Sequence, residues 1–430
     1  MLLILIISAF FLFWTAIRKN NYWKNRGIPG PEPSPWKGNL DLIFNKNPSS
    51  LQLFDWSKKY GRIYGIKNGW FNTLVISEPE MVKELLLINL RVNPMIGNVN
   101  TNSMAHLFAT KGRRWKRLRH IANPAFSTFN LKRALPIIDD TIQNNIKILK
   151  NTYLPGNYLN IVDYFTELTF DVIYRLAMGQ KDSKEFCQLS RDTLTVFNNN
   201  IFDYLSYIFP WLGLNVLSPF LGATGNLRRD PGQILIEKIY EAVIRRKEEK
   251  LKKNKKEEEE DEENLKNKKW VNFIDLFLES EAENVELKEY SGTFNRSEKV
   301  EKFLTPVYGS PVNIDISPGT LPHKLGRFDE FLGWNERRNS IDEIVMNLFL
   351  FLLTGFDTTA NTLSLIAHNL VIYPQVQKRL FEEIEEICGL EEGEIINYEQ
   401  LAKLKYADAV FYETQRLCPM AAALVFFIKK

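Results

Sequence analysis

One long, largely apolar stretch, residues 341–373, limits the fold of this chain more than any other feature. It runs for thirty-three residues and is followed by Pro374, a residue that cannot continue a regular helix. A helix of this length is on the order of 50 Å long, which is enough to cross a whole domain. Because the stretch is apolar on most sides, we expect a helix that is buried all round.

A membrane span is the alternative interpretation of this stretch. Lipid would then surround polar and charged side chains, among them those of Asn347, Asp357, Asn361 and His368. Such side chains are costly in the hydrocarbon core of a bilayer. We therefore favour the core helix of a folded domain.

The centre of the stretch carries the motif GFDTT at residues 355–359. Gly355 would let a flat ligand approach the backbone, because it has no side chain. The Thr358 hydroxyl can donate to the carbonyl of Thr354 one turn back and locally open the helix. This would leave room for a small molecule or water beside Asp357, a carboxylate able to relay protons. The motif therefore suits a site for a small ligand at Gly355, Asp357 and Thr358.

A second motif lies in the basic segment of residues 111–120. On a helix, Trp115 and Arg119 are four residues apart, so an indole N–H and a guanidinium point the same way. The pair suits a half-buried anionic oxygen, because both side chains donate hydrogen bonds and one is charged. The remaining basic side chains would form a face for an acidic partner. They belong to Lys111, Arg113, Arg114, Lys116 and Arg117. A solvated basic helix without a ligand is the alternative.

A third motif, E-x-x-R-L-x-P, ends the last predicted helix. Glu413 and Arg416 are three residues apart and therefore neighbours on one helix face, and Pro419 ends the helix. Taken alone, such a surface ion pair is common and contributes little stability.

The N-terminus begins with an apolar segment, residues 1–17, that contains no charged side chain. As a helix it would span on the order of 26 Å, which is adequate for a thin bilayer. Basic residues follow it, and this predicts that the body stays on the cytoplasmic side. Prolines between positions 29 and 35 would stiffen a basic, proline-rich hinge at residues 18–48. A cleaved signal peptide is the alternative, weakened by the missing basic residues ahead of the apolar run.

The composition argues against several other classes of protein. The net charge is only +3, and the charge run at residues 245–269 mixes both signs, so we expect no nucleic-acid partner. The three cysteines, Cys187, Cys388 and Cys418, are widely spaced and form no CxxC pair. No two of the four histidines lie at metal-ligand spacing. These patterns exclude a disulfide scaffold and a cysteine zinc site.

Between these motifs the sequence predicts mostly helices. A hairpin is expected around Asn68-Gly69, with strands at 63–66 and 73–76 and a loop longer than the minimum. Residues 305–340 are rich in proline and glycine without a period, and we interpret them as an atypical insertion, either a genuine surface insertion or an artefact of how the gene was read. Helices are expected at residues 49–60, 80–90, 131–149, 162–178, 233–250 and 270–280.

In their order and spacing, the anchor, the Pro-Gly-Pro hinge, W-x-x-x-R, G-x-D-T-T and E-x-x-R-L-x-P together resemble a microsomal cytochrome P-450. Within that family, the sequence is most similar in character to the nematode-like members of the drug-metabolising clan. The resemblance implies a fold that is mainly α with small β-sheets, incomplete at the C-terminus and carrying an N-terminal transmembrane anchor. It implies an anchor at 1–17, a hinge at 18–48 and a haem domain at 49–430, interrupted by the 305–340 insertion.

The resemblance also implies a function, that of a haem-thiolate monooxygenase in the endoplasmic reticulum membrane. It would oxidise lipophilic small molecules with dioxygen and with electrons from an NADPH-dependent flavoprotein reductase docked at residues 111–120. Trp115 and Arg119 would hold a haem propionate. Gly355, Asp357 and Thr358 would line the oxygen pocket and supply protons. Glu413 and Arg416 would form a buried pair that locks the core around the haem.

One departure from the family concerns the iron ligand. The family ligates haem iron through a cysteine in a glycine-framed loop well after E-x-x-R, whereas this sequence ends at Lys430. Cys187, Cys388 and Cys418 each lack that setting, so we expect no metal ligand here and place the family cysteine beyond Lys430. The alternative function is an inactive, truncated membrane-bound remnant or an interaction protein.

Overall fold

The computed structural model describes only part of the chain. The described residues are 14–15, 18–44, 49–89, 106–108, 110, 112–152, 159–181, 183–198, 205, 208–217, 219–220, 230–257, 272–280, 340–389 and 396–420. The predicted transmembrane segment, except for two residues, and all but one residue of the predicted insertion lie outside them.

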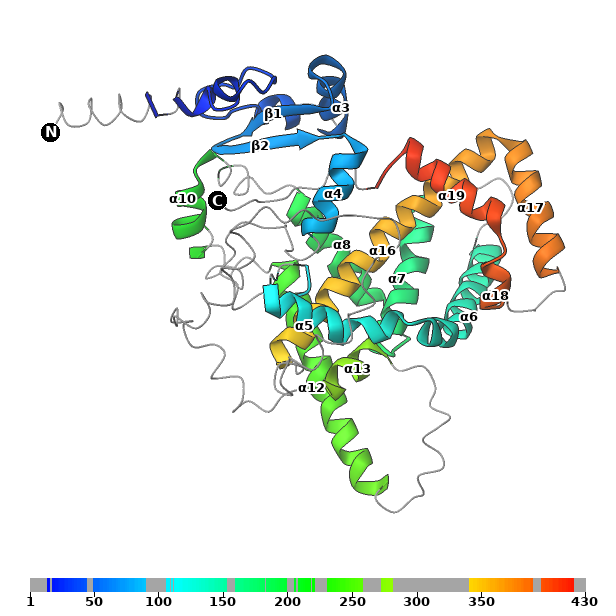
Figure 1. Ribbon diagram of the computed structural model, residues 1–430. Coiled ribbons are helices and arrows are strands. Elements are labelled where there is room, and N and C mark those ends of the chain that lie inside the picture. Colours follow the sequence, from blue (N-terminus) through cyan, green and yellow to red (C-terminus); the bar gives the residue numbers. More distant parts are fainter. Residues whose placement is uncertain are drawn as a thin grey trace, which may run out of the picture.

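The described residues are mainly helical with one small two-stranded sheet, which confirms the mainly α part of the predicted fold (Figure 1). Most predicted helices are present and differ from the expected bounds by a few residues at each end, as is usual for helix termini. The helices outside the central one are α2 Leu40–Phe44, α3 Ser49–Tyr60, α4 Pro79–Asn89, α5 Gly112–Ala122, α6 Thr128–Thr152, α7 Ile161–Met178, α8 Lys184–Asn198, α10 Pro210–Leu212, α12 Pro231–Glu257, α13 Phe273–Glu279, α17 Pro374–Cys388, α18 Tyr398–Leu401 and α19 Lys405–Leu417. Short 3-10 turns, η1 Lys24–Arg26 and η2 Asn123–Phe126, and a π-helical turn, η3 Gly213–Leu217, complete the helical elements.

The apolar stretch forms one helix, α16, from Ile341 to Ile372. It begins with a capping box, in which Ser340 accepts a hydrogen bond from the Glu343 N–H and the Glu343 side chain accepts one from the Ser340 N–H. Although α16 is long and apolar enough to span a membrane, 61% of its most apolar window is buried inside the protein. This burial supports the prediction of a core helix.

The main hydrophobic core forms where α16 packs along α7, with α8, α12 and α13 around them (Figure 1). Phe170 of α7 and Phe356 of α16 meet edge to face, with ring centroids 5.1 Å apart. Both rings are almost completely buried. A long apolar helix therefore finds its partner surfaces within the chain, as a helix that is apolar on most sides requires.

The hairpin is tighter than the sequence predicted. Strand β1, Ile63–Asn68, pairs with the antiparallel strand β2, Phe71–Ile76, and Asn68 is directly opposite Phe71. The loop therefore has two residues, not the longer loop expected. Gly69 has φ +59°, a left-handed conformation that glycine adopts without strain and that closes so short a turn.

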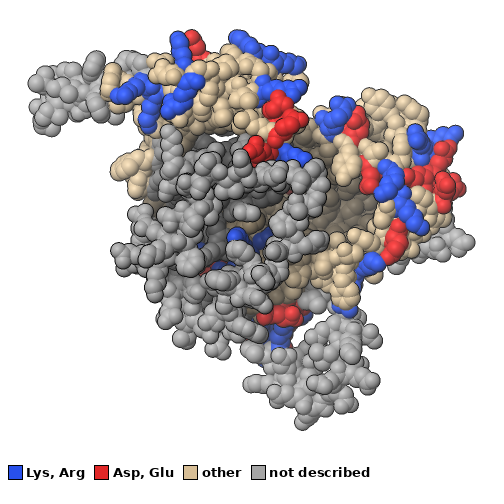
Figure 2. Space-filling model, viewed as in Figure 1, with Lys and Arg blue, Asp and Glu red and all other residues tan. Residues whose placement is uncertain are grey.

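The basic, proline-rich segment predicted as a hinge packs onto this hairpin. Gly65 N donates to the Pro29 carbonyl over 2.9 Å, and the Trp23 indole donates to the Ile66 carbonyl over 2.9 Å. A side chain at Gly30 would collide with the Gly65 carbonyl oxygen, so the two backbones approach as closely as glycine allows. Residues 18–39 are thus fixed to the sheet by directional contacts. Figure 2 shows Lys and Arg gathered along this edge of the molecule, whereas both charges alternate over α17 and α19.

Candidate functional site

The centre of α16 carries a series of hydroxyl side chains that donate to the carbonyl four residues back. The predicted bond from Thr358 Oγ1 to the Thr354 carbonyl is confirmed at 3.2 Å. Thr354 and Thr362 make the same kind of bond, to Leu350 and Thr358 at 2.8 Å each. The α-helix nevertheless continues unbroken from Ile341 to Ile372, so the predicted local opening of the helix is wrong. Each of these carbonyls accepts a hydrogen bond from the hydroxyl in addition to the one from the backbone N–H of the helix.

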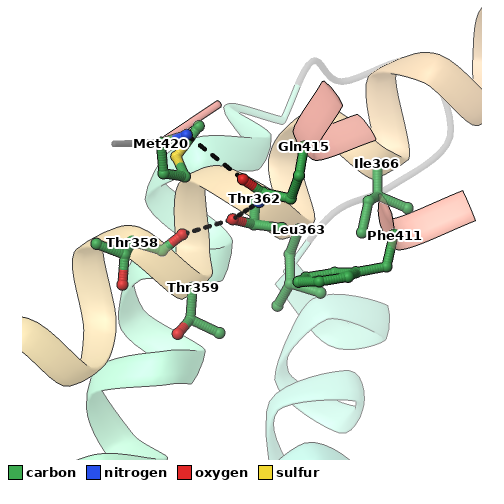
Figure 3. Close-up of a pocket in the computed structure, with 8 residues that line it drawn as sticks. All are labelled: Thr358, Thr359, Thr362, Leu363, Ile366, Phe411, Gln415 and Met420. Carbon is green, nitrogen blue, oxygen red and sulfur yellow. Dashed lines mark hydrogen bonds between the residues drawn. The ribbon is translucent and has the colours of Figure 1, made fainter. Parts of the chain in front are cut away.

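A pocket of about 420 Å³ lies between α16 and α19, and we call it the α16–α19 pocket (Figure 3). Gln415 of α19 crosses to α16, where its Nε2 donates to Thr362 Oγ1 over 2.8 Å. Thr362 in turn donates to the Thr358 carbonyl, which joins the two helices through one polar chain. The pocket is lined by Thr358, Thr359, Thr362, Leu363, Ile366, Phe411, Gln415 and Met420.

Of the three predicted catalytic residues, only Thr358 lines this pocket. Asp357 lies on an exposed part of α16 next to it, and its carbonyl accepts from Asn361 Nδ2. A Cβ built on Gly355 would come 2.6 Å from Ile173 Cγ1 of α7. The glycine is therefore required for close packing of two helices, a different reason from the approach of a flat ligand.

Sequence reasoning missed the α19 side of the pocket, which includes Gln415 and Phe411. Gln415 stands inside the E-T-Q-R motif, where only Glu413 and Arg416 had been singled out. A glutamine has no characteristic spacing that predicts a cross-helix bond. On α16, Thr362 could have been found because it lies one helical turn after Thr358.

The basic helix α5 does not present all its basic side chains to a partner. Arg114 Nε donates to Glu343 Oε1 over 2.8 Å, and Arg117 donates to both oxygens of Glu343 over 2.5 and 2.9 Å. The Glu343 side chain is only 3% exposed. Two of the five side chains assigned to the acidic-partner face therefore point into the protein, and that part of the prediction is wrong. The physical reason is a buried carboxylate on α16 that arginine alone can pair bidentately.

Trp115 and Arg119 lie on a neighbouring side of α5. Trp115 is half-buried and Arg119 is exposed. Among the described residues, neither side chain has a hydrogen-bond partner, in contrast to Arg114 and Arg117. The assignment of these two N–H donors to an anionic ligand stays a prediction.

The Glu413–Arg416 pair forms with good geometry but is not buried. Arg416 Nε and Nη2 donate to the two Glu413 oxygens over 2.7 and 2.6 Å, while the side chains are 67% and 56% exposed, respectively. The bond from Arg416 lowers the pKa of Glu413 below its usual value. The prediction of a buried lock is therefore wrong for the described structure, because the face of α19 that meets α16 carries Thr414 and Gln415.

The three cysteines differ in exposure. Burial raises the pKa of the Cys187 thiol to about 11, Cys388 is buried at the end of α17, and Cys418 is exposed at the end of α19. None of them lines the α16–α19 pocket. Within the described part of the chain, no group of three or more His, Cys, Asp or Glu side chains could hold a metal ion.

Comparison with known proteins identifies the family. The cytochrome P450 family model matches residues 28–305 and 330–426. The chain is 30% identical to cytochrome P450 CYP13A7 of Caenorhabditis elegans over 97% of its own length and 73% of the relative. It is 30% identical to CYP13A8 of the same nematode over 98% and 75%, and 31% identical to CYP13A4 over 94% and 71%. The chain thus belongs to the cytochrome P450 family, whose members are haem-dependent monooxygenases.

Proposed function

We propose that this protein oxidises lipophilic small molecules with dioxygen, using electrons delivered by a flavoprotein reductase. The family supplies the reaction class, because its haem carries out the oxygen and electron chemistry when bound. The observation that carries the proposal is the place of Thr358, a hydroxyl at the wall of a largely apolar pocket on the long core helix. An apolar pocket with a few polar groups suits a small lipophilic ligand.

The described residues fit the organic part of a haem better than its iron. Trp115 Nε1 and the Arg119 guanidinium are donors without a protein partner among the described residues, and a propionate carboxylate would satisfy both. The α16–α19 pocket offers apolar walls from Leu363, Ile366 and Phe411. Its lining contains no cysteine, so we assign no iron ligand to the described residues and derive no step that passes through the metal.

For proton supply we assign Thr358 and Asp357 on adjacent positions of α16. The Thr358 hydroxyl donates its hydrogen bond to the Thr354 carbonyl, so the lone pairs of Thr358 Oγ1 can accept a hydrogen bond from a water in the pocket. The exposed Asp357 carboxylate can take up a proton from solvent and pass it on through such a water. Gln415 holds Thr362 next to this position and so keeps the wall of the pocket in place.

We assign the membrane and the reductase to two different surfaces. The segment around α10 and η3 exposes large apolar side chains, with Trp211 71% and Phe220 54% exposed, and such a patch suits a lipid surface. In Figure 1, α10 lies on the same side of the picture as the first described residues of the chain, drawn in dark blue. Together with the apolar residues 1–17 and the basic residues after them, this supports anchoring to the endoplasmic reticulum with a cytoplasmic body.

For the reductase we retain helix α5, with a smaller docking charge than the sequence predicted. Lys116, Arg119 and His120 are exposed on it, whereas Arg114 and Arg117 are bonded to Glu343. An acidic flavoprotein surface would complement these exposed side chains and would be steered to them in a salt-dependent way.

The first test of the proposal is the reduced, carbon-monoxide-bound absorption spectrum of the purified full chain. A thiolate-type Soret band supports the monooxygenase; its absence together with absent haem binding supports the inactive alternative. The second test is Thr358→Ala in a haem-loaded chain, which should raise oxygen consumption relative to product formed. Ser364→Ala is the matched control, because its hydroxyl makes the same bond one turn back, to Ala360, away from the pocket. Equal coupling in both variants would contradict the role of Thr358.

A further inference from the structure

Glu343 occupies the junction between the basic helix α5 and the first turn of α16. We infer that Glu343 is a positioning residue, which fixes the rotation of α5 and thereby turns Trp115 and Arg119 toward their ligand. The ligand part of this inference rests on the proposed function, since it takes these two side chains as the propionate-binding side of α5. The fixation of the helix itself rests on contacts alone.

Both oxygens of the buried Glu343 carboxylate are fully used by N–H donors. Oε1 accepts from Arg114 Nε at 2.8 Å and from Arg117 Nη2 at 2.5 Å. Oε2 accepts from Arg117 Nη1 at 2.9 Å and from the Ser340 backbone N–H at 3.2 Å. One carboxylate thus joins the cap of α16 to two positions, one turn apart, on α5.

These bonds fix an angle as well as a distance. Leu118 and Ile121 hold α5 against the rest of the protein by apolar contact, which is non-directional and tolerates rotation of the helix. A planar guanidinium that bonds both oxygens of a carboxylate tolerates little rotation. Arg117 bonds both oxygens and Arg114 bonds one of them, so the direction of Trp115, which lies between them on the helix, is fixed as well.

The chain that leads into α5 is tied to the same turn of α16. The Leu107 backbone N–H donates to Asn347 Oδ1 over 2.9 Å, and Asn347 Nδ2 donates to the Glu343 carbonyl over 2.7 Å. Asn347 is itself buried. The start of the segment and the helix that follows therefore share one anchor on α16, and Glu343 lies at its centre.

The decisive variant is Glu343→Gln, which keeps the size of the side chain and removes its charge. Asp275→Asn is the matched control. Asp275 is also largely buried and accepts from Arg246 Nε and Nη2 at 2.9 Å each, but it joins α12 to α13. Both variants remove the charge of a largely buried carboxylate and leave partly buried arginine side chains poorly paired, so both lose stability. Only the first should release α5.

The first measurement is hydrogen–deuterium exchange of the full chain without haem. We expect Glu343→Gln to speed amide exchange in residues 112–122 about tenfold or more, and Asp275→Asn to speed it only around residues 273–279. The second measurement is titration with haem, where we expect Glu343→Gln alone to weaken binding severalfold and to shift the Soret band. Should Glu343→Gln not fold, Arg114→Gln removes one arm of the anchor and should give the same changes to a smaller extent.

Exchange in residues 112–122 that is the same in Glu343→Gln as in Asp275→Asn would overturn the positioning role. Faster exchange there with unchanged haem affinity and spectrum would support the fixation of α5 by Glu343. It would contradict the claim that this fixation turns Trp115 and Arg119 toward a ligand. That second result would count against the proposed function at Trp115 and Arg119, so the two failures can be told apart.

Discussion

Gly355 offers a direct test of how closely α16 and α7 pack. The variant Gly355→Ala adds a single methyl group at the centre of the core helix. That methyl would lie 2.6 Å from Ile173 Cγ1, 3.0 Å from Cδ1 and 3.2 Å from Cβ. Ile173 cannot simply turn away, because a β-branched side chain on a helix has one strongly preferred rotamer. The two helices must therefore separate by several tenths of an ångström.

Two opposing effects decide the size of the change. Alanine is the better helix former by about 1 kcal/mol, which favours Gly355→Ala. Overpacking of a core costs about 1–3 kcal/mol, and three contacts of 3.2 Å or less place this site in the upper part of that range. We therefore expect a net loss of about 1–2 kcal/mol in the free energy of unfolding.

The assay is urea unfolding of the purified chain, followed by far-UV circular dichroism, in a double-mutant cycle with Ile173→Ala. Removing the Ile173 side chain beyond Cβ takes away the two closest clashing atoms, so the double variant should recover most of the overpacking cost, about 2–3 kcal/mol, relative to the sum of the single variants. A Gly355→Ala protein more stable than wild type by the full helix-propensity gain would refute the packing argument. Additive effects would refute it as well.

Two further predictions concern pH and thiol chemistry. Burial raises the pKa of Asp275, but hydrogen bonds from Arg246 and the charge of Lys250 outweigh it and hold that pKa below its usual value. A carboxyl group whose pKa is lower in the folded than in the unfolded chain stabilises the fold at pH values above the unfolded-state pKa. This stabilisation is lost as the pH falls through the folded-state pKa, so Asp275→Asn should make the loss of stability below about pH 4 less steep. An unchanged dependence of stability on pH in the acid range would contradict the pairing. With an aromatic disulfide reagent at pH 8, Cys418 should react rapidly in the folded chain, whereas buried Cys187, with its raised pKa, and buried Cys388 should react only on unfolding; fast labelling of two or more thiols per folded chain would contradict the assigned burial.

Sequence spacing predicted those site contacts that lie within one helix. The bond from Thr358 to the Thr354 carbonyl and the pair of Glu413 with Arg416 both follow from positions three or four residues apart. The long helix itself followed from its length and apolar character. Such features depend on the regular geometry of one element and need no knowledge of its neighbours.

Most failures of sequence reasoning at the site concern which face of a helix is covered. The sequence predicted that Gly355 faces a ligand, whereas in the structure it packs against Ile173. Gln415 belongs to no motif that predicts its bond to Thr362. The Glu413–Arg416 pair has the expected bond, yet its exposure depends on which side of α19 meets α16.

The sequence by itself therefore determined the helical class of this protein, its family motifs and the local bonds along α16 and α19. Only the tertiary structure decided that Arg114 and Arg117 turn inward while Trp115 and Arg119 remain available. The reason is that Arg117 and its partner Glu343 are 226 positions apart, and no local pattern on α5 specifies which carboxylate will be buried beside it. Helix geometry sets the directions in which side chains can point, and long-range packing selects which of those directions leads into the protein.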